Sequence, residues 1–119
     1  MIYHITARKA WRDAQQRGDY RAQSLETEGF IHCSSNTQVL PVADKYYPGQ
    51  RGLFLLMIDP ALLTSELKWE PPAEGAPPPG VPEGELFPHV YGPINLDAIV
   101  KVFDLETDSD GKHTAPALD

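Results

Sequence analysis

Residues 53–58 read Leu-Phe-Leu-Leu-Met-Ile, a continuous apolar run. Such a run is typical of a central strand covered on both faces, because every position of that strand must then be apolar. Asp59 and Pro60 follow directly, as a capping carboxylate and a proline at the first position of a short helical turn. We therefore expect the chain to fold around a strand over residues 53–58.

Weaker strand signals flank this run on both sides. Five stretches are rich in strand-forming residues: residues 2–5, 30–33, 66–69, 86–91 and 98–105. The stretch at 66–69 suits an edge strand, and Gly92 and Pro93 mark a turn before the last strand.

A first helix is predicted over residues 7–17, between the first two strands. Thr6 is its expected N-cap, and Gly18 is expected to end it. Its apolar residues fall at helical spacing and form a narrow face: Ala7, Ala10, Trp11 and Ala14.

A second helix is predicted to run from Ser35 to about Tyr46. Ser35 and Gln38, three residues apart, have the pattern of a capping box. Pro41 conflicts with this start, because proline removes a helical N–H after the first turn. The helix is therefore expected to begin later or to bend at Pro41.

These elements predict one α/β domain of the α+β type over residues 1–105. The 119 residues and the 41% hydrophobic content suit a single domain with a real core. Residues 71–84 contain six prolines and three glycines, which predicts an irregular loop inside the domain. Residues 106–119 are polar and are expected to form a disordered tail.

The charge is unevenly distributed along the chain. Residues 1–51 hold seven basic and five acidic residues, a net +2, whereas residues 52–119 hold three and twelve, a net −9. The total of −7 and the absence of a dense basic stretch argue against a broad DNA or RNA surface. A small anionic ligand near the N-terminal half remains compatible with this distribution.

The sequence is that expected of a cytoplasmic protein. No apolar run approaches the roughly 18–20 residues that span a bilayer, and the first residues lack the pattern of a secretory signal. Cys33 is the single cysteine, so no internal disulfide forms. The oligomeric state is not encoded in any pattern of the sequence.

Three histidines share a short pattern in which a hydroxyl residue follows two positions later. The pattern reads His4-Ile5-Thr6, His32-Cys33-Ser34 and His89-Val90-Tyr91. In a strand, residues two apart point to the same face, so each imidazole is expected beside its hydroxyl. Imidazole donates, accepts or titrates near neutral pH, and strand ends are where α/β sheets place ligands. The pattern predicts a histidine-lined pocket; the alternative is three core histidines, each satisfied by a hydrogen bond.

Three longer motifs connect the chain to a known family. They are IYHIT over residues 2–6, YRAQSLETEGFIHCS over residues 20–34 and FPHVYGPI over residues 87–94. With these motifs in this order, the sequence resembles the bacterial and plant domain of unknown function 952 family over roughly residues 1–105. The Pro-rich stretch 71–82 looks longer than the family usually carries. That family has no established reaction, so the resemblance implies a fold and a pocket.

The family's fold resembles that of the ADP-ribosyltransferases, which hold NAD in a split, mixed sheet. The resemblance implies a split mixed sheet with two main helices here as well. It places His4 and Thr6 on the first strand, and residues 29–34 with Tyr46 on the second strand and its helix. Glu85 is the nearest match to the glutamate that those enzymes carry on a late strand.

Two departures from that pattern bear on the site. Pro88 lies three residues after Glu85 and would break a central strand ladder, which either displaces Glu85 or leaves its role to His89. No glycine follows His4, where related enzymes let NAD approach the backbone.

The leading hypothesis is an NAD-binding ADP-ribosyl transferase or NAD-cleaving enzyme with a small-molecule substrate. Its catalytic candidates are Glu85, His32 and His89. Its cofactor-binding candidates are His4, Thr6, Arg21, Ser34, Tyr46 and Tyr91. A carboxylate such as Glu85 would stabilise the positive charge that builds on the ribose when the nicotinamide–ribose bond breaks. His4 and Thr6 suit ribose hydroxyls, Tyr46 suits stacking on nicotinamide, and Arg21 suits a phosphate.

Two alternatives stay open at this point. The same pocket could serve a non-catalytic module that binds a nucleotide or a small anion. Three neutral imidazoles at His4, His32 and His89 could instead hold Zn²⁺ for a metal-dependent hydrolase, although their spacing lacks a local ligand signature. Cys33 follows His32 directly, and adjacent strand residues point to opposite faces, so Cys33 is expected to be a buried apolar residue rather than a nucleophile.

Overall fold

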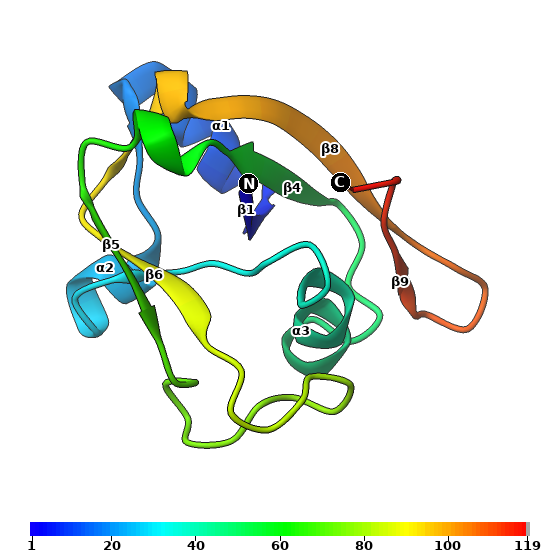
Figure 1. Cartoon of the computed structure of the whole chain (residues 1–119). Helices are drawn as coiled ribbons and strands as arrows, with labels where there is room; N and C mark the ends of the chain where they lie inside the picture. Colours follow the sequence, from blue (N-terminus) through cyan, green and yellow to red (C-terminus); the bar gives the residue numbers. More distant parts are fainter. Residues whose placement is uncertain (119) are drawn as a thin grey trace.

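Strand β4 (Leu53–Ile58) is the centre of the larger sheet, as its apolar sequence predicted. The structure is a computed structural model and describes residues 1–118. β4 pairs with β1 (Ile2–Ala7) on one side and with β8 (Ile99–Thr107) on the other. A short strand, β9 (His113–Thr114), pairs with β8 at the edge, so the order is β1-β4-β8-β9 and every pair is antiparallel (Figure 1).

Both faces of this sheet are covered, which explains why β4 is apolar at odd and even positions alike. Leu56 and Ile58 belong to a core cluster that includes Ala14 of helix α1 (Arg8–Arg17). Leu53 and Leu55 point the other way, into a cluster with residues of helix α3 (Val39–Tyr46). The prediction of a central strand covered on both faces is confirmed.

A second sheet and a short ribbon complete the domain. The second sheet has the order β3-β6-β5, from β3 (Ile31–His32), β6 (Phe87–Tyr91) and β5 (Glu66–Glu70). A ribbon joins β2 (Asp19–Tyr20) to β7 (Ile94–Asn95). One bridge, between Tyr3 of β1 and Ser34, ties the first sheet to the segment that follows β3.

The fold class is therefore the expected one, a single α+β domain whose sheet is split. The strand directions differ from the mixed sheet that was expected. Every strand pair within residues 1–118 is antiparallel, so the described chain contains no parallel pair.

The first helix ends as its sequence predicts but is not capped as expected. Gly18 takes φ +102°, a left-handed conformation that favours glycine, and its N–H bonds the Ala14 carbonyl oxygen. At the other end, Ala7 occupies the N-cap position and makes no side-chain cap bond. The Thr6 side chain is engaged elsewhere, as described below. A short helix, α2 (Gln23–Thr27), follows β2.

Helix α3 begins at Val39, four residues later than the capping pattern suggested. One half of the capping box is present, since the Ser35 backbone N–H donates to Gln38 Oε1 at 2.9 Å. Pro41 is then the third helical residue, where its missing N–H would have had no helical partner in any case. The late start resolves the conflict that Pro41 posed.

The remaining connections are two 3₁₀ turns and one long loop. Asp59 accepts a hydrogen bond from the Ala61 N–H at 3.0 Å and so caps η1 (Pro60–Leu62), as its sequence predicted; η2 (Leu96–Ala98) precedes β8. Residues 71–84 contain no helix or strand, in agreement with their composition.

The segment from Glu106 differs from the polar tail that was expected. β8 continues to Thr107, and β9 turns back along it. His113 is buried; its backbone N–H donates to Asp44 Oδ1 at 2.9 Å, and its Nε2 donates to the Tyr47 carbonyl oxygen. These contacts attach the C-terminal hairpin to α3 and to the turn that follows it.

Candidate functional site

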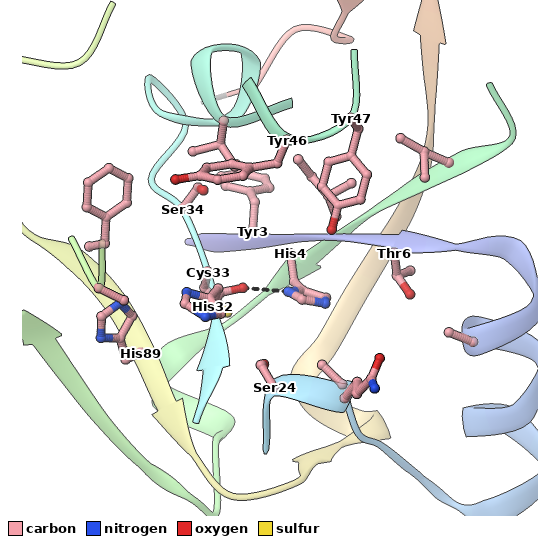
Figure 2. A pocket seen from close by; sticks show the side chains of 18 of the residues that line it. Tyr3, His4, Thr6, Ser24, His32, Cys33, Ser34, Tyr46, Tyr47 and His89 are labelled. Atoms are coloured by element: carbon pink, nitrogen blue, oxygen red, sulfur yellow. Dashed lines mark hydrogen bonds between the residues drawn. The ribbon is translucent and has the colours of Figure 1, made fainter. Parts of the chain in front are cut away.

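A cavity of about 540 Å³ opens between the two sheets, within the size range of small-molecule sites. Its walls come from β1, the β2–α2 segment, β3, α3, the Pro-rich loop and β6. Seven of the candidate residues from the sequence line it: His4, Thr6, Arg21, His32, Ser34, Tyr46 and His89. The fold thus brings the three histidines of the repeated pattern into one cavity (Figure 2).

His4 is buried and uses both ring nitrogens within the protein. Its Nδ1–H donates to the His32 carbonyl oxygen at 2.5 Å, and its Nε2 lies 2.8 Å from the Tyr20 hydroxyl. A carbonyl oxygen only accepts, so a neutral His4 carries its proton on Nδ1 and accepts from Tyr20 at Nε2. Burial lowers the pKa of His4 from 6.5 to about 4, so the ring is neutral at pH 7.

The hydrogen-bond chain continues from Tyr20 to Thr6. The two hydroxyl oxygens are 2.9 Å apart, and because the Tyr20 proton goes to His4, Thr6 donates to the Tyr20 oxygen. This bond explains why Thr6 does not cap α1, since its hydroxyl is turned toward Tyr20. Burial raises the pKa of Tyr20 to about 12, so the hydroxyl stays protonated and keeps the chain intact.

His4 makes the stability of the fold sensitive to acid. The pKa of its ring is 6.5 when exposed and about 4 when folded, so protons bind the unfolded chain first as the pH falls. His4 costs no stability above pH 6.5, and from there to pH 4 the free energy of unfolding is expected to drop by about 3 kcal/mol on its account. Urea unfolding of the wild type and of His4→Gln across this pH range measures that loss. The difference between their free energies of unfolding should change as the pH falls.

The exposed Gln15→Ala on α1 serves as the control for this titration, and its pH profile should parallel that of the wild type. A difference between the wild type and His4→Gln that stays constant from pH 7 to pH 4 would contradict a buried, neutral His4.

His32 lies at the open side of the cavity. Its Nε2–H donates to Glu28 Oε2 at 3.0 Å, and both side chains are nearly half exposed. Nδ1 has no hydrogen-bond partner among residues 1–118 and is therefore available to a ligand. The His32 backbone carbonyl oxygen accepts the hydrogen bond from His4. His32 therefore contributes its side chain to the cavity and also holds the His4 ring in position.

His89 is buried and is held by a carboxylate. Its Nδ1–H donates to Glu70 Oε1 at 2.8 Å, and the Tyr91 hydroxyl donates to the same oxygen at 2.5 Å. The Phe30 ring stacks on the imidazole with a centroid distance of 4.3 Å. With Nδ1 as the donor, a neutral His89 presents Nε2 as a bare acceptor, and Nε2 has no partner within the described chain.

The His32 and His89 rings are neighbours, with centroids 5.6 Å apart in an edge-on arrangement (Figure 2). Each is bonded to its own carboxylate, Glu28 or Glu70. Hydrogen bonds from Tyr91 and then His89 lower the pKa of Glu70, so this carboxylate is ionised at neutral pH. A carboxylate that fixes the tautomer of an imidazole is the arrangement by which proteins prepare histidine as a base.

Glu85 and Tyr91 are the two candidates that do not line the cavity. The buried Gln38 amide donates to Glu85 Oε1 at 2.8 Å and to the Leu86 carbonyl oxygen at 2.9 Å. Glu85 is thereby held beside the start of α3. Tyr91 acts through Glu70 rather than on the cavity itself.

The other candidates lie along the cavity wall. Arg21 donates to both carboxylate oxygens of Asp19, at 3.1 and 3.2 Å, and Arg17 donates to the same carboxylate at 2.9 Å. Ser34 exchanges backbone hydrogen bonds with Tyr3, each of 2.8 Å. Tyr46 is 43% exposed and presents its ring at the α3 side of the cavity (Figure 2).

Over residues 5–102 the sequence matches the family model described as a protein of unknown function, DUF952. The chain belongs to the DUF952 family. The membership inferred from the three sequence motifs is confirmed, whereas the likeness to ADP-ribosyltransferases stays a prediction. No curated protein matches this DUF952 protein.

Solved structures of protein CC0527 from Caulobacter crescentus are similar to this DUF952 protein. The crystal structure is 32% identical, covers 95% of this chain and 92% of its own, and has a TM-score of 0.81. The crystal structure of a double mutant is 31% identical with the same coverage and a TM-score of 0.80. The solution NMR structure is 33% identical over 93% of this chain and 89% of its own, with a TM-score of 0.73.

Two classes of chemistry find no site in the part of this DUF952 chain that the structure describes. No group of three or more His, Cys, Asp or Glu side chains within residues 1–118 is arranged to hold a metal ion. Burial raises the pKa of the Cys33 thiol far above neutrality, so this side chain is not a thiolate nucleophile at pH 7.

In residues 1–118 no helix has the length and apolarity needed to cross a bilayer.

Glu70 and Tyr20 are two of the site residues of this DUF952 protein that the sequence patterns did not reveal. A signal for Glu70 was present in strand pairing: Lys68 lies opposite His89, so Glu70, two positions on, lies on the same face and diagonal to it. That register could not be known before β5 and β6 were paired. Tyr20 reaches His4 across the junction between ribbon and sheet, for which the sequence carries no local signal.

Proposed function

We propose that the cavity binds NAD and that the protein transfers the ADP-ribosyl group to water or to a hydroxyl of an acceptor. The observation that carries the proposal is the set of three imidazoles around one cavity of nucleotide-binding size. One of them is locked neutral by burial, and two are backed by carboxylates. Membership of the DUF952 family, with its resemblance to ADP-ribosyltransferases, favours NAD over other nucleotides.

The proposed reaction breaks one bond and forms one. The glycosidic bond between the nicotinamide nitrogen and ribose C1′ breaks, and its electron pair leaves with neutral nicotinamide. The acceptor oxygen bonds to C1′, and its proton passes to an imidazole and then to solvent. NAD⁺ and an alcohol or water thus give the ADP-ribosyl product, nicotinamide and a proton.

His89 is assigned the role of general base in this scheme. Its Nδ1–H is committed to Glu70, so Nε2 is the atom that takes the acceptor proton. His32, whose ring centroid is 5.6 Å from that of His89, is assigned the binding of the acceptor or of a ribose hydroxyl through Nδ1. His4 serves as a positioning residue, because both of its nitrogens are already bonded within the protein.

The position of Glu85 favours a second candidate, a non-catalytic nucleotide-binding module. Glu85 was expected to stabilise the developing charge on the ribose, but it is bonded to Gln38 and does not line the cavity. A protein without that carboxylate at the ribose would still bind NAD but would cleave it more slowly. The two candidates share the NAD site and differ in turnover.

Calorimetric titration with NAD tests the site, and chromatographic detection of nicotinamide tests the reaction. We expect NAD to bind with a dissociation constant below about 1 mM, which corresponds to about −4 kcal/mol. Tyr46→Ala should weaken binding about fivefold by removing one stacking face, whereas Lys9→Ala, on the exposed surface of α1, should not change it.

The outcomes separate the candidates. Binding with nicotinamide release supports the transferase, and binding without release supports the module. Absence of NAD binding at millimolar concentration would remove both.

A further inference from the structure

The Pro-rich loop between β5 and β6 forms one wall of the cavity. Pro72, Ala73, Glu74 and Pro78 all line it. Pro78 and Val81 are buried, so the loop is anchored on the body of the domain. The loop therefore contributes side chains to the site rather than passing over the surface.

Local hydrogen bonds and prolines hold this wall in shape. Turns are closed by the Gly75 N–H on the Pro72 carbonyl oxygen at 3.0 Å and by the Val81 N–H on the Pro78 carbonyl oxygen at 3.1 Å. Proline restricts the backbone torsion φ and reduces the freedom that such a loop would otherwise have. A side chain carried on this loop consequently has a defined position relative to the cavity.

Glu74 is the one carboxylate among the described residues that line the cavity. No Lys or Arg within residues 1–118 forms a salt bridge with it. Glu74 acts on the Tyr46 hydroxyl, whose pKa is raised by burial, by the negative charge of Glu74 and by a hydrogen bond to that carboxylate. The α3 side of the cavity thus combines an exposed tyrosine ring with an uncompensated negative charge.

The basic residue of the same cavity belongs to another wall. Arg21 is the one Lys or Arg among the described lining residues; it lies in the β2–α2 segment, where it shares the Asp19 carboxylate with Arg17. At Tyr46 the charge that acts on the hydroxyl is that of Glu74. An aromatic face beside a carboxylate is a favourable environment for a cation.

We propose that Glu74 and Tyr46 form a charge-selective subsite that accepts a cationic aromatic ring and rejects the same ring when it carries a carboxylate. The proposal rests on the proposed function, because the pyridinium ring of NAD is its expected occupant. The tyrosine face attracts the delocalised positive charge, and the Glu74 carboxylate adds attraction for a cation and repulsion for an anion. The substrate class is thereby narrowed to dinucleotides with a nicotinamide ring, to the exclusion of their nicotinic acid counterparts.

Three probes that share a pyridine ring and differ in charge test this subsite. They are the cation 1-methylnicotinamide, the neutral nicotinamide and the anion nicotinate. Their affinities are measured by chemical-shift titration of the isotope-labelled full chain. In the wild type we expect the cation to bind at least about tenfold more tightly than the anion, with nicotinamide in between. In Glu74→Gln the ratio should fall to about twofold, because the amide keeps the shape of the side chain and loses the charge.

Glu83→Gln is the matched control, since Glu83 is an exposed acid of the same loop and does not line the cavity. It should leave the ratio as in the wild type. Tyr46→Leu should weaken the cation and leave the anion unchanged. Equal binding of the three probes, no binding of the cation, or a preference that survives in Glu74→Gln would overturn the inference.

Parallel titrations with NAD and with its nicotinic acid analogue separate this inference from the proposed function. NAD binding without any charge preference would overturn the subsite and leave the NAD site standing. A preference for 1-methylnicotinamide without NAD binding would support the subsite and contradict the proposed function.

Discussion

Replacing His89 with glutamine is expected to slow nicotinamide release from NAD by about 10²- to 10⁴-fold, the usual contribution of a general base. The amide of glutamine still reaches Glu70 as a donor, but it cannot take a proton from the acceptor. In the proposed scheme His89 acts on the acceptor and not on NAD, so the dissociation constant of NAD should change by less than about threefold. Calorimetry and turnover measured on the same preparation separate the two effects.

Glu70→Gln tests whether the carboxylate positions His89. Loss of the Glu70 charge leaves the imidazole free to change tautomer, so kcat should fall by about tenfold or more while KM stays within about twofold. Glu70→Asp should recover part of that loss. The matched control is Glu66→Gln, an exposed acid of the same strand whose contact is with Lys68 at 3.8 Å.

Full turnover in His89→Gln would show that another group takes the proton.

Replacing Leu55 with alanine is expected to lower the free energy of unfolding by about 3 kcal/mol. Leu55 is fully buried at the centre of β4, opposite Ile5 of β1 and Phe103 of β8. Truncation removes its contacts and leaves a cavity in the cluster that packs under α3. The strands on both sides of β4 prevent this cavity from collapsing. Since domains of this size have a stability of about 5–15 kcal/mol, this is a large fraction of the total.

Urea unfolding followed by circular dichroism measures this loss as a shift of the midpoint by roughly 2 M. Leu62→Ala provides the comparison, because Leu62 in η1 is 47% exposed and its truncation should change stability by less than about 0.5 kcal/mol. Similar losses for the two variants would mean that β4 is not the centre of the core.

Much of the fold could be predicted because it rests on short-range physics. The apolar run at residues 53–58 had to be buried on both sides, whatever covered it. Gly18 had to end a helix, because its left-handed conformation is accessible to glycine at little cost. Asp59 capped its turn by a bond that closes within two residues.

The parts of the fold that differed from expectation depend on partners far along the chain. Thr6 did not cap α1, because Tyr20 and His4 offered its hydroxyl a buried bond. The segment after Glu106 became an edge strand, because β8 gave it a template and Asp44 on α3 accepted the His113 backbone N–H. Local composition, which is polar there, carries no trace of these contacts.

The sequence by itself determined the elements around β4, the family and the histidine pattern that marks three strands. Each of these follows from local pattern, since side-chain alternation and apolar runs act on neighbouring residues. Only the tertiary structure decided which carboxylates the imidazoles meet: Glu70 reaches His89 through strand register, and Gln38 holds Glu85 away from the cavity. A hydrogen bond between distant segments depends on where the whole chain has folded, and no spacing along the sequence encodes that position.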